Sequence, residues 1–220
     1  MLAEYGNQHG QVTDPPVPLD HIVEDHLKVA IEYRDFRGQY PEGDVLGGIW
    51  FNDKLIGIDL SLAPEDFPAR RGRYRFTLAH ELGHWRLHRH LYLRRANERT
   101  LLSDEPSRPD HVLRSHQSDP KEIQANKFAA ALLMPREMVK RVWHEWSGNM
   151  DPIYLADLRQ RQDEVLPRGG PPMSEDRIYN ALFERACKPL AEQFQVSAES
   201  MRIRLEQLGF LKRKKEATLF

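Results

Sequence analysis

The sequence predicts an α+β fold, with a small antiparallel sheet near the N-terminus and helices over the rest of the chain. In the runs 29–34 and 55–62, apolar residues alternate with polar ones, and the run 45–51 between them is short and mostly apolar, which is typical of strands. From about residue 73 onward, apolar residues recur at helical spacing instead. Because the third run alternates throughout, we expect a sheet with one buried face and one wet face.

The elements are expected in the following order. Residues 1–18 are polar and end in a Pro-rich stretch, which predicts a flexible arm that contributes nothing to a core. A short helix at residues 19–27 precedes the first strand. Five helices are expected after the sheet, at residues 73–91, 119–133, 135–146, 175–193 and 198–208.

This order divides the chain into a flexible arm at residues 1–18, a core at residues 19–146, an insertion or linker at residues 147–174, and a helical segment at residues 175–220. Two long polar connections, 94–118 and 164–173, fall between predicted helices. Loops of this length in a compact domain are typical of lids, substrate-facing segments or disorder.

The composition is that of a soluble globular protein, and it argues against DNA-binding, membrane and secreted proteins. Lys and Arg number 32 against 33 Asp and Glu, so the net charge of −1 gives the chain as a whole no attraction to DNA or to an anionic membrane. The longest apolar run, 128–134, is far shorter than the roughly 20 residues that span a bilayer, and no secretory signal is visible. The single cysteine, Cys187, fits a reducing compartment, and we expect a cytoplasmic protein without membrane attachment.

The most informative stretch is His80-Glu81-Leu82-Gly83-His84. On a helix, His80 and His84 are about 400° apart in rotation, so their imidazoles stand one turn apart on one face and can share a metal ion. Glu81 lies outside the ligand set but within reach of a metal-bound water, as in the H-E-x-x-H motif of zinc hydrolases. Because a chain with one cysteine has no Cys-rich structural site, we expect one catalytic Zn²⁺ per chain with an open coordination position.

The third metal ligand has three candidates, and two of them are histidines. His90 occupies the third-ligand position of the longer motif H-E-x-x-H-x-x-G-x-x-H. Leu87 stands where that motif has its turning glycine, so on a continuous helix His90 points away. His88 lies on the correct face but two turns beyond His80, too far for the same ion, and is expected to support the site from its edge.

Glu122 is the third candidate, and it shares a helix face with Asn126 and Ala129. Small residues on this face would let the helix approach the histidine helix closely, with Gly83 as the matching small residue. Glu122 also fits a capping box that begins at Asp119. Spacing alone therefore leaves the ligand role and the capping role open.

Two blocks of the sequence together resemble the ImmA/IrrE family of zinc metallopeptidases. They are RFTLAHELGH at residues 75–84 and EIQANKFAAALLMP at residues 122–135. The resemblance covers residues 19–145 and implies a gluzincin-like core, in which a small sheet packs on the metal-bearing helices. It also implies that Glu122 is the third zinc ligand beside the two histidines, with Glu81 as the general base.

The resemblance further implies a substrate. Members of this family are associated with stress responses and mobile-element switches, in which they cleave helix-turn-helix transcriptional repressors. We therefore expect a zinc-dependent endopeptidase that acts on such a repressor, with Asn126 and His88 supporting the ligands from behind. An oxyanion-stabilising residue must come from elsewhere, and His144, Tyr154 and arginine residues are candidates. The alternative is a DNA-binding or partner-binding regulator whose metal site is not catalytic.

The C-terminal segment resembles the helix-turn-helix-like segment that follows the peptidase core in this family. Ser197 would cap its second helix. Its small core would consist of Ala191, Phe194, Val196, Met201 and Leu205. A DNA-reading role would use Arg202 and Arg204, with phosphate contacts from residues 212–215. We favour a helical pair that packs on the peptidase or its substrate and expect no direct DNA binding, because the net charge is slightly negative and Gln195 replaces the glycine common in DNA-binding turns.

Overall fold

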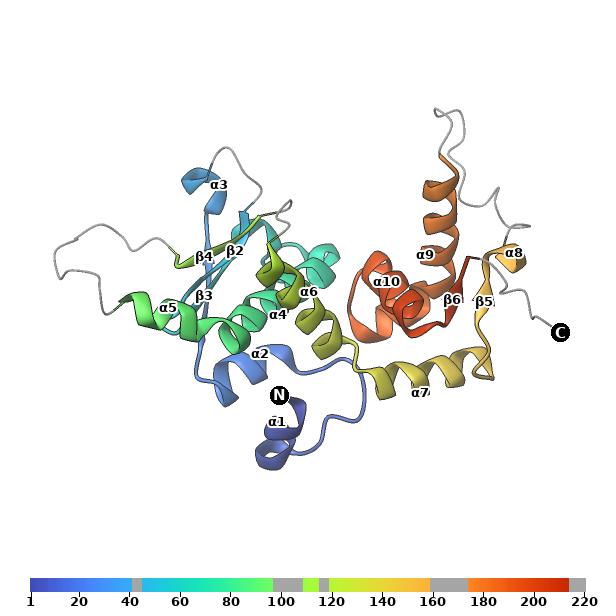
Figure 1. The fold of residues 1–220 in the computed structure, drawn as a ribbon, viewed down its shortest axis with the longest axis horizontal. Coiled ribbons are helices and arrows are strands. Elements are labelled where there is room, and N and C mark those ends of the chain that lie inside the picture. Colours follow the sequence, from blue (N-terminus) through green and yellow to red (C-terminus); the bar gives the residue numbers. More distant parts are fainter. Residues whose placement is uncertain (41–44, 97–108, 115–118, 159–173, 214–220) are drawn as a thin grey trace. The chain divides into compact units, whose positions relative to one another are not determined.

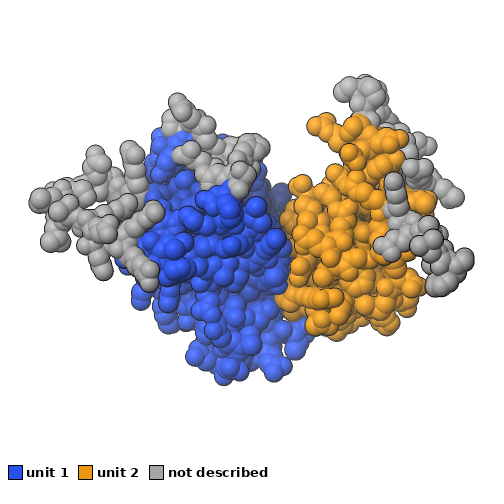
Figure 2. All heavy atoms as spheres, viewed as in Figure 1, with its two compact units in different colours: residues 1–133 blue, residues 134–220 orange. Residues whose placement is uncertain are grey.

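The structure is a computed structural model of the 220-residue chain. It describes residues 1–40, 45–96, 109–114, 119–158 and 174–213. The chain divides into two compact units, Met1–Leu133 and Met134–Phe220 (Figure 2). Most of the predicted connection 94–118 and all of 164–173 lie outside the described residues.

The first unit combines a four-stranded sheet with helices (Figure 1). Its helices are α1 (Leu2–His9), α2 (Leu19–His21), α3 (Phe36–Gln39), α4 (Arg71–Leu87), α5 (Arg89–Ala96) and α6 (Pro120–Leu133), with the helical turns η1 (Ile22–His26), η2 (Leu60–Leu62) and η3 (Pro68–Arg70). Its strands are β1 (Ala30–Arg34), β2 (Val45–Trp50), β3 (Leu55–Asp59) and β4 (His111–Arg114). The α+β class expected from the sequence is confirmed.

The sheet is mixed rather than antiparallel, which corrects the sequence prediction. Its strand order is β1-β3-β2-β4. β2 and β3 form the expected antiparallel hairpin, with Gly47 opposite Ile58, and β4 pairs antiparallel with β2. β1 instead pairs in parallel with β3, with Ala30 opposite Leu55. Alternation shows which residues form a strand but not the direction of the neighbouring strand, so this pairing had no local signal.

β3 is buried on both faces, so the expected wet face is also wrong for this strand. α4 packs against β2 and β3. Gly57 faces an aromatic cluster, since a Cβ added to it would lie 2.8 Å from the Trp50 ring and 3.0 Å from the Phe36 ring. Leu60, which the alternation places in the core, is 48% exposed because the strand ends at Asp59 and the chain turns into η2.

α4 packs closely against α6, and this contact positions the candidate site. Leu78, Leu82 and Trp85 of α4 are buried. A Cβ added to Gly83 would lie 3.1 Å from the Ala125 Cα atom, so the two helix backbones approach closely, as the small residues predicted. The first turn of α6 thereby reaches the middle of α4.

The N-terminal residues contribute to the core, contrary to the expectation for residues 1–18. Tyr5 and Val17 are buried. Tyr5 packs among three imidazole rings, those of His9, His21 and His26. Glu4 of α1 forms an ion pair with Arg86 of α4, with 2.6 Å between the charged atoms. Helix α1 is therefore docked on the first unit, through contacts between residues far apart in the sequence.

The second unit is mostly helical. Its elements are α7 (Arg136–Ser147), β5 (Ile153–Tyr154), α8 (Leu155–Leu158), α9 (Glu175–Phe194), α10 (Ala198–Leu208) and β6 (Leu211–Lys212). β5 pairs in parallel with β6, and α9 packs against α10. Ser197 caps α10 by accepting a hydrogen bond from the Ser200 backbone N–H, and the five apolar residues expected in the small core are buried, as predicted. No helix in the described parts of either unit is long and apolar enough to cross a membrane.

Candidate metal centre

Helix α4 holds two histidines one turn apart on the face that meets α6. The side chains of His80 and His84 are fully buried. Their Nε2 atoms lie 3.0 Å apart. The spacing of four residues therefore places both imidazoles at one point, as the sequence predicts for the helix.

Glu122 reaches the same point from the first turn of α6. One carboxylate oxygen lies 3.2 Å from the His80 Nε2 atom, and the other lies 3.2 Å from the His84 Nε2 atom. Asp119 caps this turn, since its side chain accepts a hydrogen bond from the Lys121 backbone N–H at 2.8 Å. The Glu122 carboxylate is thus left to face the histidines.

Asn126, one turn further along α6, determines which nitrogen of His80 carries a proton. Its Oδ1 atom lies 2.9 Å from the His80 Nδ1 atom. An amide oxygen only accepts hydrogen bonds, so His80 donates from Nδ1 and presents a lone pair at Nε2. Asn126 therefore lies where the sequence predicts a side chain that supports the metal ligands.

His88 and Gln124 act on His84 in the same way. The Gln124 Oε1 atom lies 3.0 Å from His88 Nε2, and His88 Nδ1 lies 3.1 Å from His84 Nδ1. The amide oxygen accepts the His88 Nε2 proton, so a neutral His88 accepts the Nδ1 proton of His84. His84 therefore also presents a lone pair at Nε2. Burial lowers the pKa of His84 to about 4, which keeps its ring neutral at pH 7.

His80, His84 and Glu122 form a group that fits a metal ion. Their ligand atoms lie within 4.8 Å of one another, and all three residues are buried. With the proton of each ring on Nδ1, the two Nε2 atoms, 3.0 Å apart, face each other with lone pairs. Among the described residues, Glu122 Oε1 is buried without a well-directed hydrogen bond. A cation would accept both lone pairs and balance the charge of the carboxylate. Two imidazoles and a carboxylate are the donors of catalytic zinc sites with a free fourth position, although they also suit manganese and iron.

Glu81 lies beside this group against the sheet. A Cβ added to Gly47 of β2 would lie 2.9 Å from the Glu81 Oε1 atom, so only glycine leaves room for the carboxylate. Both Glu81 oxygens are buried, and neither has a hydrogen-bond partner among the residues that the structure describes. Burial raises the pKa of Glu81 to about 8, and the nearby His111 acts in the opposite direction. A buried carboxyl without a partner is costly to fold and marks a functional position.

His111 belongs to the site but was missed in the sequence. Its Nε2 atom lies 2.6 Å from the Glu122 Oε1 atom, and its ring centroid lies 4.0 Å from that of His84. It stands on β4, a strand of four residues inside a stretch predicted to be a loop. A single histidine in a polar stretch carries no spacing signal, so nothing in the sequence indicated its position.

The other histidines and the tyrosine considered from the sequence are not members of the group of three. His90 is exposed on α5 and takes no part in the group of three. His88 follows the last residue of α4, Leu87, and its side chain is buried. His144 and Tyr154 belong to the second unit, and their proposed role at the oxyanion stays a prediction.

The two arginines that a DNA-reading role would use have partners within the second unit. Arg202 is 7% exposed, and its Nε atom lies 3.0 Å from a Glu184 oxygen. Arg204 donates from Nε to the Met134 carbonyl oxygen at 3.0 Å. These contacts favour a role in packing over one in base recognition. Residues 214 and 215 of the basic tail lie outside the described residues.

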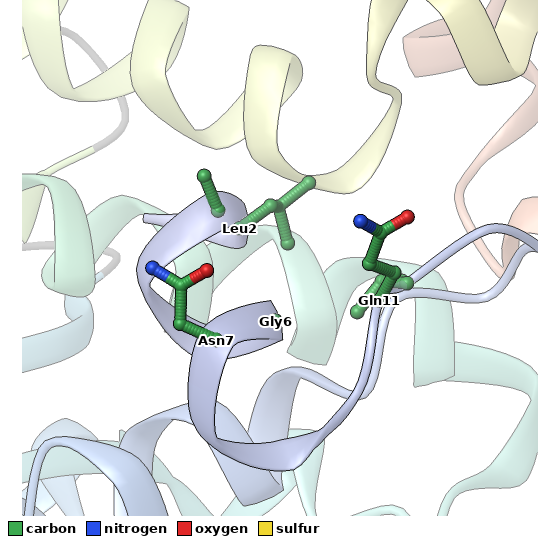
Figure 3. Close-up of a pocket in the computed structure, with 6 residues that line it drawn as sticks. Leu2, Gly6, Asn7 and Gln11 are labelled. Atoms are coloured by element: carbon green, nitrogen blue, oxygen red, sulfur yellow. The ribbon is translucent and has the colours of Figure 1, made fainter.

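A surface pocket lies between α1 and the segment that follows it (Figure 3). It is lined by Leu2, Ala3, Gly6, Asn7, Gln11 and Val12. These side chains include no acid, base or nucleophile, so the pocket offers no hydrolytic chemistry. The residues suited to hydrolysis are instead the buried His80, His84 and Glu122 on α4 and α6, with Glu81 beside them.

Part of the chain matches the model of a known protein family. Residues 69–157 match the model of the Peptidase M78 family, described as the IrrE N-terminal-like domain. A search of curated proteins finds no match. The matched range includes α4, β4 and α6, and therefore every residue of the candidate metal centre.

Proposed function

Through residues 69–157 the chain belongs to the ImmA/IrrE family of metallopeptidases, and from this premise we propose that it is a zinc-dependent endopeptidase. One observation carries the proposal: three metal-ligating atoms with free electron pairs converge beside a buried carboxylate that has no partner. In a purely structural zinc site, four protein ligands fill every coordination position, so an additional buried carboxylate beside the ion would have no role.

Each residue of the site has a distinct part in this proposal. His80, His84 and Glu122 would hold the metal ion. When bound, the ion would lower the pKa of a bound water toward about 7 and polarise the scissile carbonyl. In its ionised form, Glu81 would accept a proton from the attacking water and later return it to the leaving amine. The absence of a hydrogen-bond partner leaves the Glu81 oxygens free for this exchange.

The substrate we propose is a helix-turn-helix transcriptional repressor of a stress or mobile-element response. This part rests on family membership, because no residue of the site selects a sequence. The placement of β4 supports a protein substrate, since it is an edge strand of the sheet and carries His111 next to the metal group. An extended peptide could pair with such an edge through its main chain. The single cysteine supports a reducing compartment, which we propose is the cytoplasm.

Proteolysis of a purified helix-turn-helix repressor encoded beside the gene tests this function. The wild-type protein should cut the repressor, with fragments identified by mass spectrometry. The Glu81→Gln variant should bind zinc as well as the wild type and leave the repressor intact. Equal cleavage by the variant would contradict the role of Glu81. Loss of zinc together with activity would contradict the division of roles between Glu81 and the ligands.

A further inference from the structure

We propose that His111 is a positioning residue for the metal ligand Glu122. Its imidazole would donate a hydrogen bond from Nε2 to Glu122 Oε1 and direct the other carboxylate oxygen at the metal ion. The inference rests on the proposed metal site and adds a fourth side chain to it.

The distance between the two side chains carries the inference. His111 Nε2 lies 2.6 Å from Glu122 Oε1, the shortest of the three contacts between this carboxylate and an imidazole, since those to His80 and His84 are 3.2 Å. Both atoms are buried, and among the described residues neither has a hydrogen-bond partner of good geometry, so each lacks a partner that the other could supply. In the proposal, the two side chains turn toward each other until the N–H points at the carboxylate oxygen and the hydrogen bond forms.

His111 is not itself a member of the converging group. The set of ligand atoms that lie within 4.8 Å of one another contains His80, His84 and Glu122 but not His111. Its ring instead packs on His84, with centroids 4.0 Å apart. The imidazole therefore lies beside the ligands, where it can orient one of them.

The fold holds His111 in this position. His111 is paired with Ile49 of β2 in the sheet. The backbone N–H of the preceding residue, Asp110, donates a hydrogen bond to the Ile49 carbonyl oxygen at 2.9 Å. The Tyr92 hydroxyl lies 3.4 Å from His111 Nδ1, and the Tyr92 ring stacks on Phe51. A hydroxyl that donates to Nδ1 leaves the proton of a neutral imidazole on Nε2, where it faces Glu122.

With His111 included, each ligand has its own polar support. Asn126 supports His80, and His88 supports His84, both at Nδ1. Without His111, Glu122 would have no such support. Its carboxylate has two equivalent oxygens, and a hydrogen bond to one of them would direct the other toward the ion. Supports of this kind typically change metal affinity by about ten- to a hundredfold.

Zinc affinity, measured on the full chain by competition with a chelating dye, tests the role of His111. His111→Leu should weaken zinc binding by about ten- to a hundredfold. His111→Gln places an amide N–H near the former Nε2 position and should stay within about threefold of the wild type. Circular dichroism of each variant confirms folding. Tyr92→Phe keeps the ring and should weaken binding by only a few-fold, which provides a second measurement if His111→Leu does not fold.

Wild-type affinity in His111→Leu would overturn the inference, as would equal losses in the Leu and Gln variants, because the hydrogen bond would then not be the cause. The readout does not depend on cleavage. A wild-type protein that binds zinc without cleaving a repressor would therefore contradict the proposed function alone, and the ratio of the variants' affinities would still decide the role of His111.

Discussion

The Nδ1 atoms of His84 and His88 lie 3.1 Å apart, and a proton that His84 donates across this contact leaves a lone pair on its Nε2 atom, which faces the other ligands. His88 in turn contacts the amide of Gln124 on α6. The packing of α4 on α6 thus sets the tautomer of a ligand through two side chains, the buried His88 and the exposed Gln124. His88 needs no direct contact with the metal ion for this role.

Replacement of His88 should therefore weaken zinc binding. His88→Phe keeps the volume of the ring but removes the acceptor for His84, and we expect zinc affinity to fall by about ten- to a hundredfold. His90→Phe is the matched control, because His90 is exposed on the next helix and should leave the affinity unchanged. Competition with a chelating dye measures both. An equal loss in the two variants would show that the effect is not specific to the chain of hydrogen bonds.

Gly47→Ala should impair catalysis without loss of metal. The added Cβ would lie 2.8 Å from the Thr77 Cγ2 atom and 2.9 Å from the Glu81 Oε1 atom, so the Glu81 side chain must move. We expect repressor cleavage to fall at least about tenfold, as for other displaced acid–base groups. Zinc content should stay at the wild-type level. Full activity in this variant would show that the position of Glu81 is not confined by the sheet.

Gly83→Ala should lower the free energy of unfolding. The new Cβ would meet Ala125 backbone atoms at 3.1 and 3.2 Å, and backbone yields less readily than a flexible side chain. Overpacking of this kind costs about 1–3 kcal/mol, which outweighs the gain of up to about 1 kcal/mol in helix propensity. Gly6→Ala in α1 is the control, because its Cβ would be at 3.5 Å or more from its neighbours and should be neutral or stabilising. Urea unfolding of both variants decides whether α4 and α6 touch as described.

Cys187 should be unreactive in the folded protein. Its side chain is buried, and burial raises the pKa of the thiol from 9.0 to about 12. At pH 8 the folded thiol is therefore almost entirely protonated, whereas about a tenth of it ionises once unfolded. Labelling with a thiol reagent should be at least about a hundredfold slower in buffer than in denaturant. Rapid labelling of the folded protein would place this part of α9 in solvent.

The sequence predicted those elements whose signals are local. The bounds of α10, the cap at Ser197 and the close approach at Gly83 follow from periodicity, from a capping residue and from small residues on a helix face. The convergence of His80 with His84 follows from helix geometry alone. The position of Glu122 required the contact between two helices, which spacing within one helix does not contain.

The features that the sequence missed all depend on contacts between distant residues. The parallel pairing of β1 with β3 is decided by which edge of the hairpin is free, not by the pattern within β1. Helix α1 is held by Tyr5 among imidazoles from other elements. His111 reaches Glu122 only because β4 pairs with β2, and four residues are too few to show an alternation.

The most direct test of the account is the zinc content of the wild-type protein and of Glu122→Ala, prepared side by side without added chelator and measured by elemental analysis. We predict close to one zinc ion per wild-type chain and clearly less in the variant, because the variant loses one of three ligands. Undiminished zinc in Glu122→Ala would contradict the three-ligand site, and no metal in either protein would contradict the assignment of a metallopeptidase centre.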